Sequence, residues 1–302
     1  MKSSEIAVPL EVESDLTEPG LLNDLMTLTK ARLSLLVIIT TFVGFLLAST
    51  GSIDWLHLLN ATLGTALAAA GAGVLNQWME VRVDRLMERT RNRPLPSGRM
   101  RPITALIFGL LLSIGGIAWL AWTCNAMSAY LAAATVVIYI AFYTPLKRKT
   151  SFCTIVGAVS GAIPPMIGWT AARPSLDLGA WVLFGILFTW QMPHFLAIAW
   201  MYRDEYAQAG FVMLRRDDAT GSSTAFESLA FTAALVAITF IPFWSGMVND
   251  SYLAGALLLD AAIFGCALRF LVERSRNAAR ALFFASILFL PLILGLMVIT
   301  KA

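Results

Sequence analysis

No residue between Pro102 and Leu146 carries a formal charge, and this long apolar stretch limits the fold more than any other feature. A helix needs roughly 20 apolar residues to cross a bilayer, so the stretch has room for two membrane spans joined by a tight turn at 123–125. Hydrophobic residues make up 58% of the chain and charged residues only 14%, against about 25% in soluble proteins. The chain is therefore predicted to be an integral membrane protein, and nothing in it points to a nucleic-acid partner.

Charge clusters and turn residues divide the chain into nine candidate spans of about twenty residues each. The spans are 33–49, 55–79, 103–122, 126–145, 152–171, 178–201, 228–247, 252–270 and 281–300. Pro164, Pro165 and Pro193 are expected to bend the fifth and sixth spans, which frees carbonyl groups that require neighbouring protein or a wet cavity. The predicted fold is an all-α bundle of nine transmembrane helices around a central chamber.

The basic residues support this count and predict its orientation. If the N-terminus is cytoplasmic, all of the 22 Lys and Arg residues except Arg173 and Lys301 fall on the cytoplasmic side. Such asymmetry is what the positive-inside rule predicts, and adding or removing one span would scramble it. We therefore expect a cytoplasmic N-terminus, a C-terminus outside, and two long charged cytoplasmic loops that follow the second and sixth spans.

The first residues of the chain are acidic and lack the apolar core of a signal peptide. Their acidity also argues against a mitochondrial transit peptide, so a bacterial plasma (inner) membrane is the expected location. Residues 1–22 are predicted to be an acidic, disordered tail, and residues 23–302 a single membrane domain. Cys124, Cys153 and Cys266 are widely separated and are interpreted as packing residues.

Oxygen-bearing side chains recur at the cytoplasmic end of the second span. Asn76, Glu80 and Asp84 are spaced by four, so a helix presents them on one face. Their oxygens suit Mg²⁺, whereas the guanidinium groups that follow, including Arg89 and Arg93, suit phosphate oxygens. This combination indicates a site for a metal-bound diphosphate. The alternative is a charged helix end in water, with Arg and Glu paired three or four residues apart.

A second acidic cluster, YRDEYAQAG at 202–210, follows the sixth span. Asp204 and Glu205 are adjacent, so only one of them can share a face with a common site. The two clusters are expected to form opposite walls of one pocket. Between them in sequence, Lys147, Arg148 and Lys149 either neutralise a diphosphate or anchor the helix end to anionic lipid.

Two ionisable groups are expected inside the membrane, His194 and Asp260. An intramembrane ionisable group is a functional candidate by default. Asp260 has no companion motif and is interpreted as a buried, hydrogen-bonded residue. His57, near the outer end of the second span, is interpreted as interfacial.

The motifs together resemble a known family. Asn76, Glu80 and Asp84 followed by MERTRNRPLPSG at 87–98 resemble the first acidic motif of the UbiA-type intramembrane prenyltransferases. YTPLKRKT at 143–150, GAIPPMIGW at 161–169, WQMPHFLAIAW at 190–200 and the RDEYAQAG stretch resemble the signatures of one subfamily, the protohaem IX farnesyltransferases. The resemblance runs from about residue 23 to the end of the chain, and the joint occurrence of five motifs makes it specific.

The resemblance implies a nine-helix enzyme that transfers the farnesyl group of farnesyl diphosphate to a vinyl group of haem B, with addition of water, giving haem O. It implies that Asn76, Glu80, Asp84, Asp204 and Glu205 are catalytic. It also implies that Mg²⁺ is the cofactor, held by Asn76, Glu80, Asp84 and Glu205. Arg89, Arg93, Lys147 and Arg148 are the expected diphosphate-binding residues, and His194 is the haem-binding candidate, as an iron ligand or through a propionate.

The second motif departs from the superfamily pattern, because Gln208 and Ala209 stand where a second acid four residues on is expected. The number of metal ions and the choice between Asp204 and Glu205 as ligand therefore stay open. The alternatives are a related enzyme that prenylates a quinone precursor or another tetrapyrrole, a membrane transporter, and a non-catalytic assembly factor. The expected partners are the two substrates, membrane lipid, and a downstream haem-modifying enzyme or oxidase.

Overall fold

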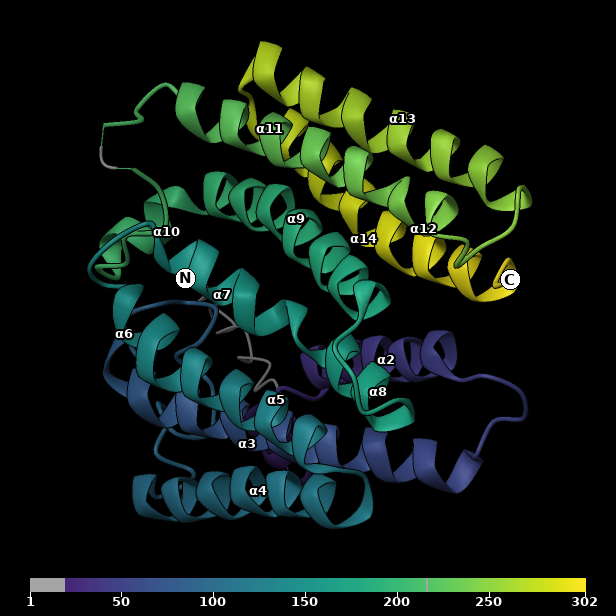
Figure 1. Cartoon of the computed structure of the whole chain (residues 1–302). Helices are drawn as coiled ribbons and strands as arrows, with labels where there is room; N and C mark the ends of the chain where they lie inside the picture. Colours follow the sequence, from purple (N-terminus) through teal and green to yellow (C-terminus); the bar gives the residue numbers. More distant parts are fainter. Residues whose placement is uncertain (1–19, 216) are drawn as a thin grey trace, which may run out of the picture.

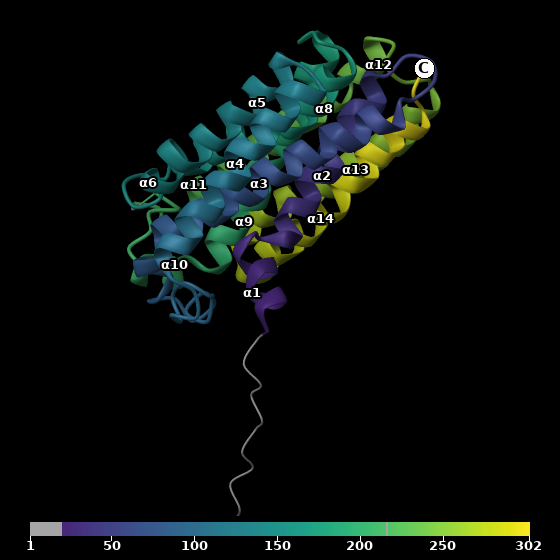
Figure 2. The same cartoon turned by 90° about the horizontal axis from the view of Figure 1, so that it is seen from below.

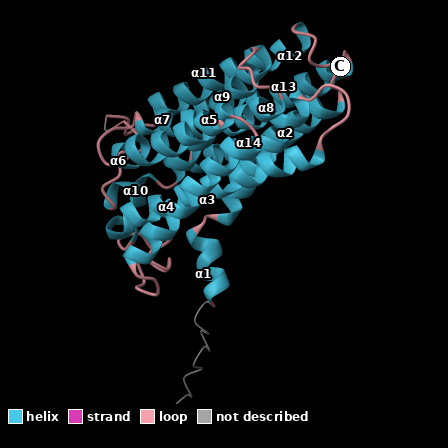
Figure 3. Cartoon of the chain, turned by 60° about the horizontal axis from the view of Figure 1, so that its bottom comes forward, coloured by secondary structure: helices cyan, strands magenta, loops and turns pink. Residues whose placement is uncertain are grey.

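The computed structural model describes residues 20–215 and 217–302, and every regular element within them is a helix (Figure 3). Most of the predicted acidic tail lies outside the described residues. Its last two residues, Leu21 and Leu22, already belong to the first helix. The helices in chain order are α1 (Leu21–Leu28), α2 (Ala31–Ala48), α3 (Trp55–Asp84), α4 (Pro102–Thr123), α5 (Ala126–Val137), η1 (Ile138–Tyr143), α6 (Thr144–Leu146), α7 (Cys153–Ala162), α8 (Pro164–Ala172), α9 (Leu178–Met201), α10 (Arg203–Gln208), α11 (Ser222–Thr239), α12 (Ile241–Trp244), α13 (Ser251–Glu273) and α14 (Arg276–Ile299).

Among the described residues, eight helical stretches are long and apolar enough to cross a membrane. Each corresponds to one of the last eight predicted spans, so the all-α membrane fold is confirmed. The first predicted span corresponds to α2, whose described apolar part, Ser34–Ala48, is shorter than the others. A ninth crossing therefore stays a prediction. α3 continues beyond the predicted limit of residue 79, so a single helix carries Asn76, Glu80 and Asp84.

The helices form two groups that meet along the middle of the molecule (Figure 1). In one group α3 packs against α4 and α2 against α8, while in the other α9 packs against α11 and α14. α7 and α8 join the groups by packing against α9. The largest apolar core surrounds α9, where Leu183 and Ile186 are fully buried.

Glycine residues allow the closest helix contacts. The Cβ atom of an alanine at Gly64 would lie 2.7 Å from a side-chain carbon of Leu120, and one at Gly71 would lie 2.7 Å from the carbonyl oxygen of Gly109. α3 and α4 therefore approach each other as closely as glycine permits. A similar contact joins α2 to α8, where an alanine at Gly168 would overlap the carbonyl oxygen of Thr41.

Prolines shape two of the spans differently. The fifth predicted span is interrupted at Ile163, where α7 ends and α8 begins with Pro164, as expected. α9 instead runs without interruption through Pro193. The fourth span has an irregularity that the sequence did not predict, because its last part is the π-helix η1. Such segments are frequent at functional sites.

The two ends of the bundle differ in character (Figure 2). α6, α10 and the loop at 85–101 gather at one end, which carries most of the basic residues. The C-terminus and α12 lie at the other end, near helix termini that bear the exposed tryptophans Trp55, Trp122 and Trp244. Tryptophan is enriched where a membrane meets water, so these residues mark one interface.

Candidate active site

α3 presents Asn76, Glu80 and Asp84 on one buried face. Their residues are 0%, 7% and 3% exposed, respectively. The sequence left open a charged helix end in water, and that reading is wrong because these side chains are enclosed by protein. A buried carboxylate requires a partner of opposite charge, and each of the two acids has one.

Each of the three residues on this face accepts a hydrogen bond from a cationic side chain. The Lys30 Nζ donates to Asn76 Oδ1 at 2.5 Å, and the Lys147 Nζ donates to the two oxygens of Glu80 at 2.8 and 3.2 Å. The Arg93 Nη1 lies 2.8 Å from Asp84 Oδ2. Three cations from three different segments therefore converge on one helix face.

The loop after α3 folds back over the end of the helix and supplies Arg93. The Thr90 hydroxyl donates to the carbonyl oxygen of Asp84 at 2.8 Å, and Arg85 Nε donates to the carbonyl oxygen of Pro96 at 3.2 Å. The loop is also tied to α1, because Arg99 forms an ion pair with Asp24 at 2.8 Å. These contacts hold the loop against the buried carboxylates.

Lys147 lies between Glu80 and two aromatic rings. Its Nζ is 4.6 Å from the ring centre of Tyr143 and 5.7 Å from that of Phe211. Burial acts to lower the pKa of Lys147, but the interactions with Tyr143 and Glu80 outweigh it and raise the pKa above its ordinary value of 10.5. The ammonium group therefore stays protonated at neutral pH.

The π-helix η1 supplies the aromatic wall of the site. Tyr139 and Tyr143 stack with their ring centres 5.1 Å apart, and Lys30 Nζ donates to the Tyr139 hydroxyl at 3.2 Å. At the end of η1, Thr144 accepts a hydrogen bond from Asn76 Nδ2 at 2.9 Å. The π-helical turn thus connects two of the cations to the oxygen face.

The second acidic cluster forms α10, which lies beside the end of α3. Val83 and Met87 pack with Ala209, Tyr206 and Phe211 in one apolar cluster, so the two predicted walls are neighbours. Asp204 and Glu205 differ in their surroundings. The Asp204 side chain is 88% exposed and lies 3.7 Å from Arg203 Nε, whereas the buried Glu205 Oε2 has no hydrogen-bond partner among the described residues.

The remaining predicted residues are more scattered. Arg89 and Arg148 are exposed at the same end of the bundle. His194 lies in α9 against α14, where its Nδ1 is 2.8 Å from the Ser286 hydroxyl. Its ring stacks on Trp190 and Phe283, with ring centres 5.1 and 5.0 Å apart, respectively. Asp260 is buried and accepts a hydrogen bond from Thr239 at 2.8 Å, as expected for a structural residue.

The donor set suits a hard divalent cation such as Mg²⁺. Asn76, Glu80 and Asp84 offer amide and carboxylate oxygens on one face of α3, and Glu205 Oε2 of α10 is buried without a hydrogen-bond partner among the described residues. Among the described residues, no three His, Cys, Asp or Glu side chains are grouped closely enough to hold a metal. Glu205 is therefore not brought into one cluster with Glu80 and Asp84.

Four residues of this site were not predicted from the sequence as functional, namely Lys30, Tyr139, Tyr143 and Thr144. The last two lie within the YTPLKRKT motif, so the motif itself was a usable signal. Lys30 stands alone at a break between α1 and α2 with a positive φ of 51°, and no pattern in the sequence connects it to Asn76.

Comparisons with known proteins identify the family of the chain. Residues 37–290 match the model of the UbiA prenyltransferase family. A relative named "Protoheme IX farnesyltransferase", from Solibacter usitatus (strain Ellin6076), is 42% identical over 289 residues, which cover 93% of this chain and 99% of the relative.

Solved structures of the same fold are more distant in sequence. A digeranylgeranylglyceryl phosphate synthase superposes with a TM-score of 0.79 at 16% identity, covering 92% of this chain and 98% of that one. A UbiA homologue from Archaeoglobus fulgidus bound to GPP and Mg²⁺ superposes with a TM-score of 0.64 at 14% identity, covering 91% and 99%. The chain belongs to the UbiA prenyltransferase family and, within it, to the protohaem IX farnesyltransferases.

Proposed function

We propose that this prenyltransferase transfers the farnesyl group of farnesyl diphosphate to a vinyl group of haem B, with addition of water, and so produces haem O. The observation that carries the proposal is the buried oxygen face of α3 with its converging cations, in a chain 42% identical to a protein named for this activity. We further propose nine membrane crossings with the site at the cytoplasmic face of a bacterial plasma membrane.

The paired charges support a role in holding a diphosphate. Lys147 is fixed beside Glu80, and Arg93 is fixed beside Asp84. The N–H groups of both cations are therefore already in position to bind phosphate oxygens. Lys30 is held in a similar way, by its hydrogen bond to Asn76. We expect these cations to exchange partners when the donor substrate binds, because carboxylate and phosphate oxygens compete for the same N–H groups.

Asn76, Glu80, Asp84 and Glu205 are the residues that would hold Mg²⁺. A bound magnesium ion would neutralise charge on the leaving diphosphate. Glu205 is favoured over Asp204 as the residue from α10, because its Oε2 is buried and unpartnered while the Asp204 side chain faces solvent. Arg89 and Arg148 are exposed at the same end and are proposed as further contacts for phosphate oxygens.

The reaction begins with departure of the diphosphate, which leaves an allylic cation that the vinyl group attacks. Tyr139 and Tyr143 present stacked rings next to the cationic groups and would limit access of water to the donor's head. Water must then add to the new cation on the porphyrin side chain. His194 is proposed to contact the haem, although its Nδ1 is already engaged by Ser286.

The proposal is tested by incubating the purified full-length protein with haem B, farnesyl diphosphate and Mg²⁺, and identifying products by mass. In ¹⁸O-labelled water, haem O carrying one labelled oxygen is the expected product, and formation should stop when EDTA removes the metal. A parallel incubation replaces haem B with a quinone precursor, and a farnesylated product there without haem O in the first incubation would assign the chain to the alternative acceptor. Label-free haem O would contradict the addition of water.

The haem contact is tested separately with His194→Ala. We expect the variant to bind haem B more weakly and to show a shifted Soret band. An unchanged spectrum and affinity would show that His194 serves only to join α9 to α14 through Ser286.

A further inference from the structure

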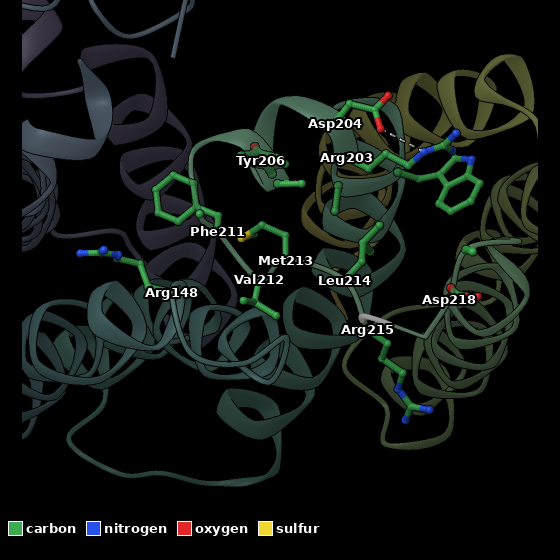
Figure 4. A pocket seen from close by; sticks show the side chains of 15 residues that line it. Arg148, Arg203, Asp204, Tyr206, Phe211, Val212, Met213, Leu214, Arg215 and Asp218 are labelled. Atoms are coloured by element: carbon green, nitrogen blue, oxygen red, sulfur yellow. Dashed lines mark ion pairs between the residues drawn. The ribbon is translucent and has the colours of Figure 1, made fainter. Parts of the chain in front are cut away.

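A pocket lies beside the oxygen face of α3, which consists of Asn76, Glu80 and Asp84. Neither Glu80 nor Asp84 lines this pocket. It has a volume of ≈ 460 Å³ and lies between the end of α9, α10 and the residues 210–215 and 218–219 (Figure 4). Three arginines line it, Arg148, Arg203 and Arg215, and we call it the arginine pocket. Its volume falls within the range of about 300–1,000 Å³ that is usual for small-molecule sites.

The lining of the arginine pocket is amphipathic. Apolar side chains from the segment at 211–214 fill its centre in Figure 4, with Arg148 on one side and Arg203 and Arg215 on the other. The guanidinium of Arg203 is 4.2 Å from the ring centre of Trp200, so an aromatic surface borders one cation. A ligand that fits this lining has a broad apolar body and anionic groups at its edge.

Two acids, Asp204 and Asp218, line the arginine pocket, and both leave its arginines available to a ligand. Asp218 caps α11, because it accepts hydrogen bonds from the backbone N–H of Ser223 at 3.0 Å and of Thr224 at 2.7 Å. Burial would raise the pKa of Asp218, but the hydrogen bonds from Thr224 and Ser223 lower it below 3.8, so its charge is committed to that helix end.

The ion pairs of Arg203 and Arg215 are exposed. Arg203 Nε lies 3.7 Å from Asp204, and Arg215 Nε lies 3.2 Å from Glu227. The two arginine side chains are 48% and 59% exposed, respectively. Exposed pairs of this kind are weak because water screens them, so a ligand carboxylate can displace them. Among the described residues, no carboxylate is paired with Arg148.

The arginine pocket adjoins the site proposed for the prenyl donor. Tyr206 and Phe211 line the pocket and also pack against Val83 and Met87 at the end of α3. Lys147, which binds Glu80, is adjacent in sequence to Arg148 and lies 5.7 Å from the Phe211 ring centre. Tyr206 and Phe211 therefore lie between the arginine pocket and the end of α3 that carries the oxygen face. Two adjacent regions that bear cationic side chains suit an enzyme with two anionic substrates.

We propose that the arginine pocket binds the propionate edge of the porphyrin acceptor, through Arg203 and Arg215. This inference rests on the proposed function, since it assumes a tetrapyrrole acceptor. In haem B the two propionates lie on the edge opposite the vinyl groups. Anchoring the propionates among these arginines directs a vinyl-bearing edge away from the charged rim, towards the apolar interior where the farnesyl chain lies.

The test compares haem B with haem B dimethyl ester, in which both propionates are masked. Full-length protein in nanodiscs of phosphatidylcholine is titrated with each compound, and binding is followed by the Soret absorbance. We expect Arg203→Gln and Arg215→Gln each to weaken haem B binding about tenfold and to leave dimethyl ester binding unchanged. Arg203→Lys should restore part of the loss.

Arg269→Gln is the matched control. Arg269 is 52% exposed and paired with Glu273 at 2.7 Å, much as Arg215 is paired with Glu227, but it lies on α13 outside the arginine pocket. The control should bind both compounds as the unaltered protein does. In the farnesyl transfer assay, the two pocket variants should raise the KM for haem B and leave the KM for farnesyl diphosphate unchanged.

Other outcomes would overturn the inference. A raised KM for farnesyl diphosphate would assign the arginines to the donor, and equal weakening of both haem compounds would show a loss of shape. An effect of the variants only in nanodiscs containing phosphatidylglycerol would assign the pocket to anionic lipid. Haem O formation with unaltered haem binding in both variants would refute the pocket and leave the proposed function standing. Propionate-selective binding without formation of haem O would support the arginine pocket and refute the proposed function.

Discussion

At the scale of single residues, the site is a buried face of α3 on which Asn76, Glu80 and Asp84 are each bonded to a cationic side chain. Glu80 with Lys147 and Asp84 with Arg93 are enclosed pairs rather than surface ones. Removing one member of such a pair leaves an uncompensated charge, which typically costs about 3–5 kcal/mol. A substitution in these pairs must therefore keep the size and shape of the side chain, so that a change in activity can be attributed to the lost charge.

The first prediction concerns Asp84. Asp84→Asn keeps the size of the side chain and leaves the hydrogen bond from Thr90 in place, because that bond goes to the backbone carbonyl. We expect haem O formation to fall by about 100-fold or more, since the neutral amide would hold Mg²⁺ against the leaving diphosphate less well than the carboxylate. Product mass spectrometry measures the loss, and a lowered but still cooperative thermal unfolding transition would show that the variant is folded at the assay temperature. Full turnover would refute the role of Asp84.

The second prediction concerns Lys147 and pH. Its pKa is raised above 10.5, so the stability contributed by the Lys147–Glu80 pair is fully present below that value and is lost only as the pH rises through the raised pKa. Lys147→Met should destabilise the protein by a similar amount throughout the range from about pH 6 to pH 9. Thermal unfolding of both proteins measures this difference. A difference that disappears within that range would show that Lys147 titrates there.

The spacing of Asn76, Glu80 and Asp84 was enough to predict a shared helix face, because helix geometry alone places them together. The partners of these residues could not be predicted in the same way. Lys30 and Lys147 reach the face from segments far away in the sequence, and their positions depend on how α2 and η1 pack against α3.

At the scale of elements, the alternation of apolar stretches and basic loops was sufficient to predict eight of the membrane spans. Pro164 marked the break between α7 and α8 correctly, since proline begins a helix readily. Pro193 produced no such break, and η1 has no signature in the sequence. Both depend on what neighbouring helices provide for the displaced backbone groups.

The third prediction tests the contact between α2 and α8. Gly168→Ala would force the new methyl group against the carbonyl oxygen of Thr41, so the helices must separate. We expect a loss of roughly 1–3 kcal/mol, visible as a lower unfolding midpoint in detergent. Gly115→Ala is the control, because a methyl group there meets nothing within 4 Å. Equal midpoints for the two variants would contradict the close approach of α2 and α8.

At the scale of the whole molecule, the two ends of the bundle have different roles. One end carries exposed tryptophans and the C-terminus, where the Lys301 Nζ donates to the carbonyl oxygens of Leu46 and Ser49 at the end of α2. The other end carries the oxygen face, α10 and the arginine pocket. The predicted orientation, with this second end in the cytoplasm, follows from the basic residues of its loops.

The central claim is that the ends of α3 and α10 hold one prenyl diphosphate between them. The most direct measurement is the affinity for farnesyl diphosphate in the presence of Mg²⁺, determined for Asp84→Asn, Glu205→Gln and the double variant. If both residues serve one ligand, each single variant should bind about tenfold more weakly or worse, and the double variant should lose little more. Losses that add independently, or unaltered binding in Glu205→Gln, would contradict the account.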